Sequence, residues 1–224
     1  MQRELVLNFH GIGTPHPGVS PEESAVWMSR ESFVAVLDRI SAVRTSARIP
    51  IGITFDDGNS SDAAIALPEL SKRRLVATFF ICAGRLGVSE YLDSQAVRDL
   101  LSAGMKIGSH GMHHRNWRNL DETTLAEEVS TARRHLEDVC GKPVNEAAVP
   151  FGSYDRRVLT RLRAEEYACV YTSDRGLARS GAWLKPRNTL GGNASLEDVA
   201  HLLANSQSPS SILRDAYRFY KGLR

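Results

Sequence analysis

Two adjacent carboxylates stand at the end of an apolar run of the chain. Residues 53–58 read Ile-Thr-Phe-Asp-Asp-Gly, so the run meets Asp56 and Asp57 and a glycine follows. Neighbouring side chains on a strand point to opposite faces, but Gly58 lets the backbone turn, and both carboxylates can then converge on one site. One could bind a metal ion while the other acts as a base. Asp-Asp-Gly is also an ordinary turn signal, so this motif is weak when taken alone.

Three imidazoles follow a second apolar run. Residues 107–114 read Ile-Gly-Ser-His-Gly-Met-His-His. His110 and His114 can share one face of a helical turn, and neutral imidazole is a common ligand of zinc and similar ions. The carboxylate of Asp57 would complete a site of two histidines and one carboxylate. A pair of His110 and His113 also fits a helical turn, and a histidine-rich polar loop is the simpler interpretation, so spacing alone does not choose.

The two segments together resemble the polysaccharide deacetylases of the NodB-homology type, carbohydrate esterase family 4. The first signature of that family is Thr-Phe-Asp-Asp-Gly, and the second is Ser-His followed by a histidine four residues after the first. Residues 54–58 and 109–114 match these signatures in order and spacing. Residues 77–80, Ala-Thr-Phe-Phe, and 149–154, Val-Pro-Phe-Gly-Ser-Tyr, match as well, so the resemblance spans residues 50 to 190.

The resemblance implies a distorted (β/α) barrel with about seven parallel strands and a role for each motif residue. Asp56 would be the general base, while Asp57, His110 and His114 would hold one divalent metal ion. Zinc is expected, and cobalt, nickel or iron would suit the same ligands. A backbone N–H near Phe151 and Gly152 would help to hold the oxyanion of the reaction. His113 stands where the family often has threonine, and we expect it at the surface or behind the ligands.

The chain departs from the family pattern at the support for the catalytic aspartate. Many members carry an arginine two residues before the Pro-aromatic-Gly of the third motif, but this chain has Ala148 there. Arg187, in Leu-Lys-Pro-Arg, resembles an arginine that follows Leu-Pro in some relatives. We therefore expect Arg187 to pair with Asp56; a surface arginine beside a proline is the alternative.

The general acid is the second departure. The chain has no counterpart of the C-terminal Leu-x-His of many members, and we expect His201 to be an ordinary helix residue. A subset of the family has a histidine at the end of the first strand, where this chain reads Asn-Phe-His-Gly over residues 8–11. His10 is then the candidate acid, unless it only satisfies backbone groups at a strand end.

These chemical residues fall at the ends of short apolar runs that alternate with helix-like segments. Repeated strand and helix imply parallel pairing with right-handed crossovers, in an open doubly wound sheet or a closed barrel. Both architectures place chemistry at the carboxyl ends of the strands. The seven predicted strands are Leu5–Phe9, Ile49–Phe55, Ala77–Cys82, Lys106–Ser109, Ala147–Val149, Cys169–Thr172 and Leu184–Lys185.

Helical periodicity predicts the segments between the strands. Ser29 is a suitable N-cap for a helix through Phe33, and Asp121 caps the clearest helix, which ends before Gly141. In that helix apolar residues recur at intervals of four and three, namely Leu125, Val129, Ala132, Leu136 and Val139. Further helices are expected after Ser60, Ser94, Tyr154 and Ser195, and over 212–220 near the end of the chain.

The composition is that of one globular α/β domain over residues 1–224. Of the 224 residues 42% are hydrophobic and 24% charged, with 28 basic and 26 acidic side chains, which excludes disordered, collagen-like and disulfide-stapled classes. Balanced charge argues against nucleic acid or an anionic membrane as partner, and no apolar stretch reaches the ~18 residues of a membrane span. The chain opens without a signal-peptide pattern and its three cysteines lie singly, so we expect a cytoplasmic protein with reduced thiols.

The function implied by the resemblance is hydrolysis of an amide. The enzyme would remove N-acetyl groups from an acetamido sugar, in a polysaccharide, an oligosaccharide or a glycan precursor, and release acetate. Trp27, Trp117 and Trp183 could stack on sugar rings, although isolated tryptophans more often pack in the core. Two alternatives remain: a cyclic amide or ureide hydrolase of the same superfamily, and a catalytically inactive carbohydrate-binding domain.

Overall fold

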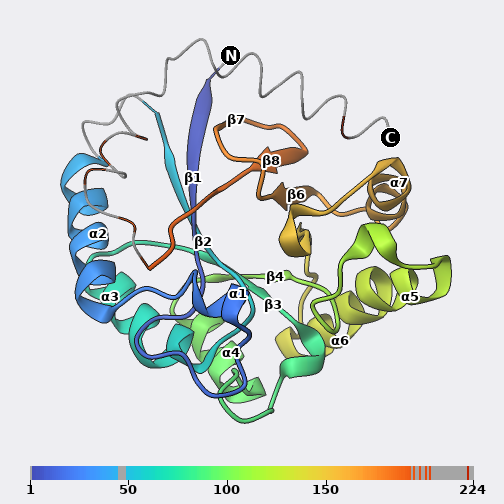
Figure 1. Cartoon of the computed structure of the whole chain (residues 1–224), viewed down its shortest axis with the longest axis horizontal. Helices are drawn as coiled ribbons and strands as arrows, with labels where there is room; N and C mark the ends of the chain where they lie inside the picture. The colour runs from blue at the N-terminus through green and yellow to red at the C-terminus, as the bar shows by residue number, and fades with distance from the viewer. Residues whose placement is uncertain are drawn as a thin grey trace.

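The sheet of this protein curls into a nearly closed barrel with helices around its outside (Figure 1). The computed structural model describes residues 2–44 and 49–192, together with residues 194, 197, 200, 202 and 221. The strand order is β7-β1-β2-β3-β4-β5-β6-β8, with β9 also paired to β1. Neighbouring strands are parallel except for β7, which runs antiparallel to β1. This is the distorted (β/α) barrel that the resemblance implies.

All seven predicted strands are present, with ends within two residues of those expected. Two further strands, β7 and β9, were not predicted. The seven predicted strands are all parallel to their neighbours, and the additional strand β7 runs antiparallel to β1. The strands are β1 Arg3–Phe9, β2 Ile51–Phe55, β3 Thr78–Ile81, β4 Lys106–Ser109, β5 Glu146–Ala148, β6 Cys169–Thr172, β7 Leu177–Arg179, β8 Leu184–Pro186 and β9 Asn188–Thr189.

The barrel closes through one continuous segment, residues 184–189. In this segment β8 pairs with β6, where Thr172 lies opposite Pro186, and β9 pairs with β1, where Leu7 lies opposite Asn188. The single residue between β8 and β9 is Arg187. The seam of the barrel therefore holds this arginine near the carboxyl ends of β1 and β2.

Side-chain alternation along the strands divides the apolar residues between two faces of the sheet. On β1, Leu5, Leu7 and Phe9 belong to the large core shared with the helices, while Val6 belongs to a small cluster with Phe80 and Tyr171 inside the barrel. That inner cluster needs a glycine opposite: a Cβ on Gly108 would lie 2.4 Å from the Phe80 ring. The interior is thus filled, and only its carboxyl end can hold a cavity.

The helices begin largely where the sequence predicts. Ser29 and Asp121 accept backbone N–H bonds as N-caps, whereas α4 and α7 are capped by Asp93 and Asp155. A short helix, α1, was not predicted. The expected helices after Ser195 and over 212–220, and His201, lie outside the described residues. The helices are α1 Pro21–Ser24, α2 Arg30–Val43, α3 Leu67–Lys72, α4 Ser94–Ser102, α5 Glu122–Ala126, α6 Ala132–Cys140 and α7 Arg156–Ala164.

The clearest predicted helix contains an interruption. A π-helical turn, Glu127–Thr131, separates α5 from α6, and Gly141 ends α6 in the left-handed conformation with φ of 63°. Leu125, Val129, Ala132 and Leu136 are all buried, so the apolar stripe continues across the turn. Periodicity alone therefore could not reveal the inserted residue.

The described chain offers no span for a membrane and no paired cysteine. None of its described helices is both long and apolar enough to cross a bilayer. Cys82 is a buried free thiol, and Cys140 and Cys169 are free and partly buried. Core packing rather than covalent cross-linking holds these residues together.

Phe55 tests how strongly the strand before the two aspartates depends on packing. Its ring is fully buried, 4.6 Å from the Phe79 ring and 5.3 Å from the Phe9 ring, measured between centroids. We expect Phe55→Ala to lower the free energy of unfolding by about 3–5 kcal/mol in chemical denaturation, because it leaves a cavity. Val76→Ala is the control, since Val76 is 57% exposed; equal effects of the two substitutions would contradict this role of Phe55.

Candidate active site

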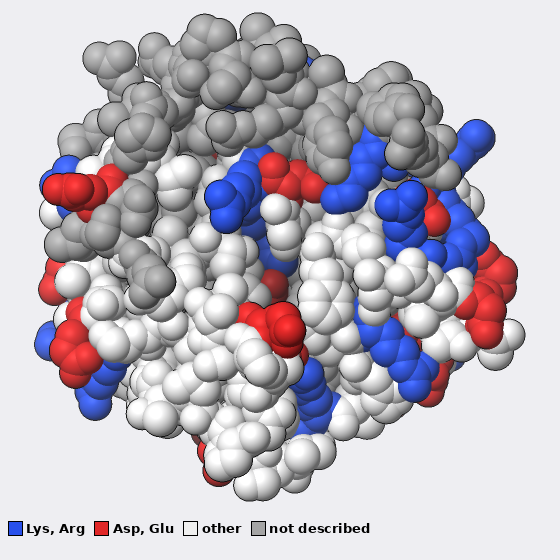
Figure 2. All heavy atoms as spheres, in the orientation of Figure 1, with Lys and Arg blue, Asp and Glu red and all other residues white. Residues whose placement is uncertain are grey.

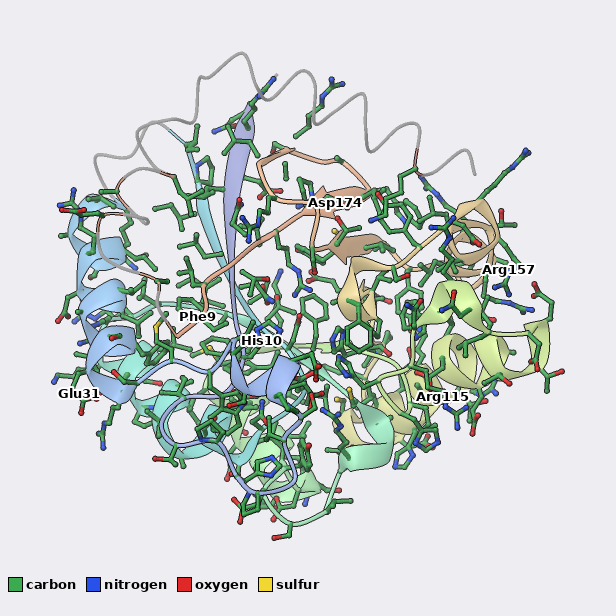
Figure 3. The ribbon with its side chains drawn as sticks, in the orientation of Figure 1. Phe9, His10, Glu31, Arg115, Arg157 and Asp174 are labelled. Atoms are coloured by element: carbon green, nitrogen blue, oxygen red, sulfur yellow. The ribbon has the colours of Figure 1, made fainter. Side chains whose placement is uncertain are left out.

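The residues that follow β1, β2 and β4 meet at the carboxyl end of the barrel. A cavity of about 380 Å³ opens there, and His10, Asp56, His110, His114, Phe151 and Arg175 contribute to its lining. Figure 3 shows His10 near the middle of the ring of strands, whereas Glu31, Arg115 and Arg157 lie toward the periphery. The structure thus brings the strand-end residues singled out by sequence into one site.

Asp56 and Arg187 form a buried, bidentate ion pair. Arg187 Nη1 lies 2.6 Å from Asp56 Oδ1, and Arg187 Nη2 lies 2.8 Å from Asp56 Oδ2. Both side chains are almost fully inaccessible to solvent. The guanidinium also lies over the Phe80 ring, 5.2 Å from its centroid. The pairing predicted from sequence is therefore present, and the surface alternative for Arg187 is wrong.

Asn8 and Thr54 complete the hydrogen-bond network around this pair. Asn8 Nδ2 donates to Asp56 Oδ2 at 2.9 Å, and Asn8 Oδ1 accepts from Thr54 Oγ1 at 2.7 Å and from Arg187 Nη1 at 2.8 Å. Side-chain alternation along β1 and β2 points Asn8 and Thr54 into the barrel. Sequence reasoning missed Asn8, although its place two residues before His10 on a predicted strand was the available signal.

The network keeps Asp56 ionised. Burial by itself raises the pKa of this carboxyl, but the positive charge of Arg187, with His110 and His10 nearby, outweighs burial and holds the pKa of Asp56 well below its usual range. Asp56 therefore carries a negative charge at neutral pH, and a hydrogen-bond acceptor is always present in the cavity.

The Asp57 side chain points toward His110 and His114 rather than toward Arg187, because its backbone leaves the strand conformation. Its φ is 78° and that of Gly58 is 75°, so strand alternation no longer applies after Asp56. A Cβ on Gly58 would also approach Ile81 Cγ2 to 2.9 Å. The turn brings Asp57 Oδ1 to 3.4 Å from His114 Nε2 and 3.8 Å from His110 Nε2. The convergence expected from Asp-Asp-Gly is thus achieved by one left-handed residue.

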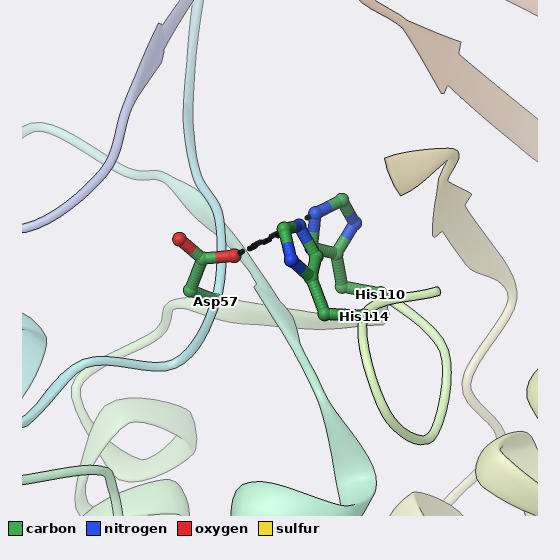
Figure 4. A group of neighbouring side chains, drawn as sticks. All are labelled: Asp57, His110 and His114. Atoms are coloured by element: carbon green, nitrogen blue, oxygen red, sulfur yellow. Dashed lines mark ion pairs between the residues drawn. The ribbon is translucent and has the colours of Figure 1, made fainter. Parts of the chain in front are cut away.

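The two histidines direct ring nitrogens toward the same oxygen of Asp57 (Figure 4). His110 Nδ1 donates to the Ala148 carbonyl at 2.8 Å, so in the neutral ring Nε2 keeps its lone pair. Burial lowers the pKa of His110 to about 4, and the ring is neutral at physiological pH. His113, the other candidate, is exposed and lies 3.6 Å from Glu127 Oε1 instead. The geometry favours His110 with His114 over His110 with His113.

Glu23, on the unpredicted helix α1, orients the second histidine. His114 Nδ1 lies 3.0 Å from Glu23 Oε1, and Arg85 Nη2 lies 2.9 Å from the same oxygen. Arg85 Nη1 is in turn 3.7 Å from Asp57 Oδ1. Burial lowers the pKa of His114, but the hydrogen bond to Glu23 and the charge of Asp57 outweigh it and raise that pKa. A carboxylate behind a histidine ligand is a common feature of metal sites, because it fixes the tautomer.

The donor set fits a divalent metal ion. One ligand atom from each of Asp57, His110 and His114 lies within 4.8 Å of the others. Asp57 Oδ1 is buried and has no hydrogen-bond partner among the described residues, and an orphaned buried carboxylate oxygen is costly unless a cation binds it. Two imidazole nitrogens and one carboxylate oxygen, with space in the cavity beside them, suit zinc and related ions.

A third buried carboxylate, Asp62, lies behind this site. Its side chain is fully buried, and neither oxygen has a hydrogen-bond partner among the described residues. Burial, with the negative charges of Asp57 and Asp56, raises the pKa of Asp62 well above its usual range. The two aspartates of the site and the burial of Asp62 thus both disfavour a negative charge on Asp62.

His10 and Phe151 both line the cavity beside the ligand set. His10 Nε2 lies 3.8 Å from Asp56 Oδ2, and His10 Nδ1 has no hydrogen-bond partner among the described residues. His10 Nδ1 therefore does not bind a backbone group, as the alternative interpretation of this histidine would require. Phe151 has φ of 57°, is 60% exposed, and its ring centroid lies 4.6 Å from that of His114.

The expectation for Gly152 needs correction. Its N–H donates to the Val149 carbonyl at 3.0 Å, and its carbonyl accepts from Lys221 Nζ at 2.6 Å. The Gly152 amide is therefore not free to hold an oxyanion. The glycine is required sterically, since φ is 59° and a Cβ would lie 2.9 Å from the Ser173 nitrogen. An oxyanion donor from this turn would have to be the Phe151 amide.

The three tryptophans do not line the cavity. Trp117 is fully buried, and Trp27 is 8% exposed. Trp183 donates its Nε1–H to the Tyr167 carbonyl at 2.7 Å, and the Arg163 guanidinium stacks 3.6 Å above its ring. Each is engaged in packing, so the idea that they stack on sugar rings is wrong for the cavity itself, where Phe151 is the exposed aromatic residue.

Charge on the outer surface is mixed. On the face shown in Figure 2, acidic and basic side chains are interspersed, and much of its lower part carries no charge. The field in the cavity is therefore set locally, by the ion pair at Asp56 and by the Asp57, Glu23 and Arg85 group.

Comparisons with known proteins find polysaccharide deacetylases among the relatives of this chain. Among curated relatives, YxkH of Bacillus subtilis is 24% identical over 182 residues, 77% of this chain and 65% of YxkH. The chitooligosaccharide deacetylase of a Bradyrhizobium strain is 27% identical over 133 residues, 58% of this chain and 59% of that protein. The chain thus spans less than two thirds of the length of these relatives.

Solved structures show the same fold. The Streptococcus pyogenes deacetylase PplD, in complex with acetate, superimposes with a TM-score of 0.77 at 20% identity, covering 90% of this chain and 98% of that one. IcaB from Ammonifex degensii gives a TM-score of 0.73 at 21% identity, covering 91% and 97%. At these identities the likeness concerns the fold.

The family itself is shown by sequence. Residues 44–170, more than half of the chain, match the family model described as polysaccharide deacetylase. The match contains Asp56, Asp57, His110, His114 and the turn at Phe151. Together with the strand-end site, it means that the chain belongs to the polysaccharide deacetylase family.

Proposed function

We propose that this protein is a metal-dependent hydrolase that removes the acetyl group from an N-acetylated carbohydrate and releases acetate. The observation that carries the proposal is the convergence of Asp57, His110 and His114 beside an ionised, arginine-paired Asp56 in one open cavity. A carbohydrate-binding domain without activity has no use for a buried carboxylate oxygen that lacks a hydrogen bond and faces two imidazoles, so the site favours the enzyme.

An amide resists hydrolysis because its carbonyl is a poor electrophile and its amine a poor leaving group. A divalent ion held by Asp57, His110 and His114 would polarise the carbonyl and lower the pKa of water. Asp56 supplies an acceptor for the proton of the attacking water, and Arg187 and Asn8 hold that carboxylate in place. His10, which also lines the cavity, would give a proton to the departing amine.

The substrate class is tested by acetate release. We expect acetate from N-acetylated oligosaccharides such as chitooligosaccharides, measured by a coupled acetate assay on the metal-reconstituted protein. Hydrolysis of cyclic ureides such as allantoin, with no acetate from acetamido sugars, would select the other hydrolase activity of the superfamily.

Metal content tests the ligand set. We expect about one equivalent of divalent metal per chain, with loss in His114→Ala, because that substitution removes one of three ligands. His113→Ala is the matched control: it removes a neighbouring imidazole that is exposed and paired with Glu127, and it should keep the metal. Elemental analysis after zinc reconstitution measures both, and an equal loss in the two variants would sink the assignment of His114.

Proton release on metal binding tests the protonation state of His114. The pKa of this histidine is raised in the metal-free protein, so a proton must leave before Nε2 can bind an ion. Metal affinity should therefore fall as pH is lowered through that raised pKa. Calorimetry at pH 6.5 in two buffers of different ionisation enthalpy should detect the released proton. Glu23→Gln removes the main cause of the shift and should reduce the release; an unchanged release would contradict the role of Glu23.

Asp56→Asn separates the base from the metal ligands. We expect kcat for acetate release to fall by about 10²–10⁴-fold, as for loss of a general base, while metal content stays near one equivalent. Loss of the metal in this variant would mean that the roles of Asp56 and Asp57 are exchanged.

A further inference from the structure

We propose that Glu128 is a positioning residue that holds the turn between His110 and His114, and thereby sets the geometry of the metal ligands. The inference rests on the proposed function, because it presumes that these histidines bind a metal ion. Glu128 lies on the far side of the histidine turn from the cavity, and it does not contribute to the cavity lining. Its contribution therefore runs through the backbone of residues 111–113.

The carboxylate of Glu128 accepts hydrogen bonds from this turn through both oxygens. Met112 N–H donates to Oε2 at 3.0 Å, and His113 N–H donates to Oε1 at 3.0 Å. Trp117 Nε1–H, from the segment that follows the turn, donates to Oε2 at 3.2 Å. Hydrogen bonds to an ionised carboxylate are stronger than those between neutral groups, so one side chain fixes two successive amides between the ligands.

Burial of Glu128 makes it depend on these hydrogen bonds. The Glu128 side chain is 0% exposed, and Arg115 Nε lies 3.9 Å from its Oε1. A buried carboxylate without bidentate pairing depends on N–H donors to replace lost water. Any other conformation of residues 111–113 would remove these donors from the buried carboxylate and is therefore costly.

The turn is also shaped around the carboxylate. Gly111 has φ of 86°, and a Cβ there would lie 2.3 Å from Glu128 Oε2 and 3.2 Å from Trp117 Nε1. His114, which closes the turn, has φ of 55°. A left-handed backbone is unfavourable for a histidine and persists only where its surroundings enforce it. The contacts of Glu128 supply that enforcement at the point where the second ligand is set.

The π-helical turn explains how Glu128 reaches this place. Glu127–Thr131 inserts one residue into the helix between α5 and α6, and Glu128 is buried beside Val129. Its neighbour Glu127 remains 44% exposed and pairs with Arg115 and His113 at the surface. Single-turn π-bulges are frequent at functional sites, and this one directs a charged side chain inward without breaking the apolar stripe.

Metal affinity and ligand geometry test the proposal together. Glu128→Gln places an NH₂ group against N–H donors, and we expect Co²⁺ affinity to fall by about 10–100-fold, as when the support of a ligand is removed. The visible d–d bands of the Co²⁺-loaded variant should also shift, because the ligands are differently placed. A purely structural role would lower the unfolding temperature and leave the bands unchanged.

Glu127→Gln is the matched control, since it removes the adjacent, exposed carboxylate. We expect wild-type affinity and spectrum for this variant. If wild type and Glu128→Gln bind Co²⁺ equally and with the same bands, the positioning role is overturned while the metal site stands. If wild type itself binds no Co²⁺, the proposed function fails instead.

Amide exchange in wild type keeps the test independent of whether Glu128→Gln folds. In the metal-free protein, the N–H groups of Met112 and His113 should exchange with solvent much more slowly than the same amides would in an unfolded chain. The reason is that both donate to a buried carboxylate. Exchange of both at the rate of exposed amides, measured by NMR, would show that Glu128 does not hold the turn and would overturn the proposal.

Discussion

The buried ion pair of Asp56 with Arg187 is the constraint around which the carboxyl end of the barrel is organised. Two charges removed from water gain little net stability from each other, but either one left alone would be costly. Their hydrogen bonds at 2.6 and 2.8 Å can form only when residues 184–189 lie between β6 and β1. Closure of the barrel and the charge state of Asp56 are therefore one structural event. The pair thereby fixes a buried anion at the carboxyl end of the barrel.

The adjacent residue shows the opposite electrostatic design. Asp56 has both oxygens bonded to Arg187 and one also to Asn8, whereas Asp57 Oδ1 is left without a hydrogen bond among the described residues. One change of backbone conformation, a φ of 78° at Asp57, separates the two environments. The first carboxylate is held as a fixed anion, and the second is left open to a cation. Neutral His110 and the Glu23-backed His114 make the open side suitable for a metal ion.

Local patterns predicted the strands, the caps at Ser29 and Asp121, and the residues at the strand ends, because each depends on a few neighbouring residues. Features that depend on distant packing were missed. Glu23 lies on a four-residue helix with no buried residue to mark it, and β9 has two residues. Glu128 is adjacent in sequence to Val129 of the apolar stripe. A charged residue at such a position is ordinarily read as part of the solvent-exposed face of the helix. Gly152 was taken as a donor because its motif suggests it, but the structure uses its N–H to close the turn onto Val149.

The position of Ala148 shows how a site can keep its electrostatics while the chain supplies the charge from elsewhere. An arginine at the end of β5 would compete for the space in which Ala148 packs with Phe80 and Tyr171. Arg187 reaches Asp56 from the seam instead and stacks over the Phe80 ring. Ala148 still serves the site, because its carbonyl accepts from His110 Nδ1 and thereby leaves Nε2 free. What the chemistry requires is a buried cation on Asp56 and a fixed tautomer on His110. In this chain the seam between β8 and β9 supplies the first and β5 supplies the second, because the barrel brings these strands together at the same end.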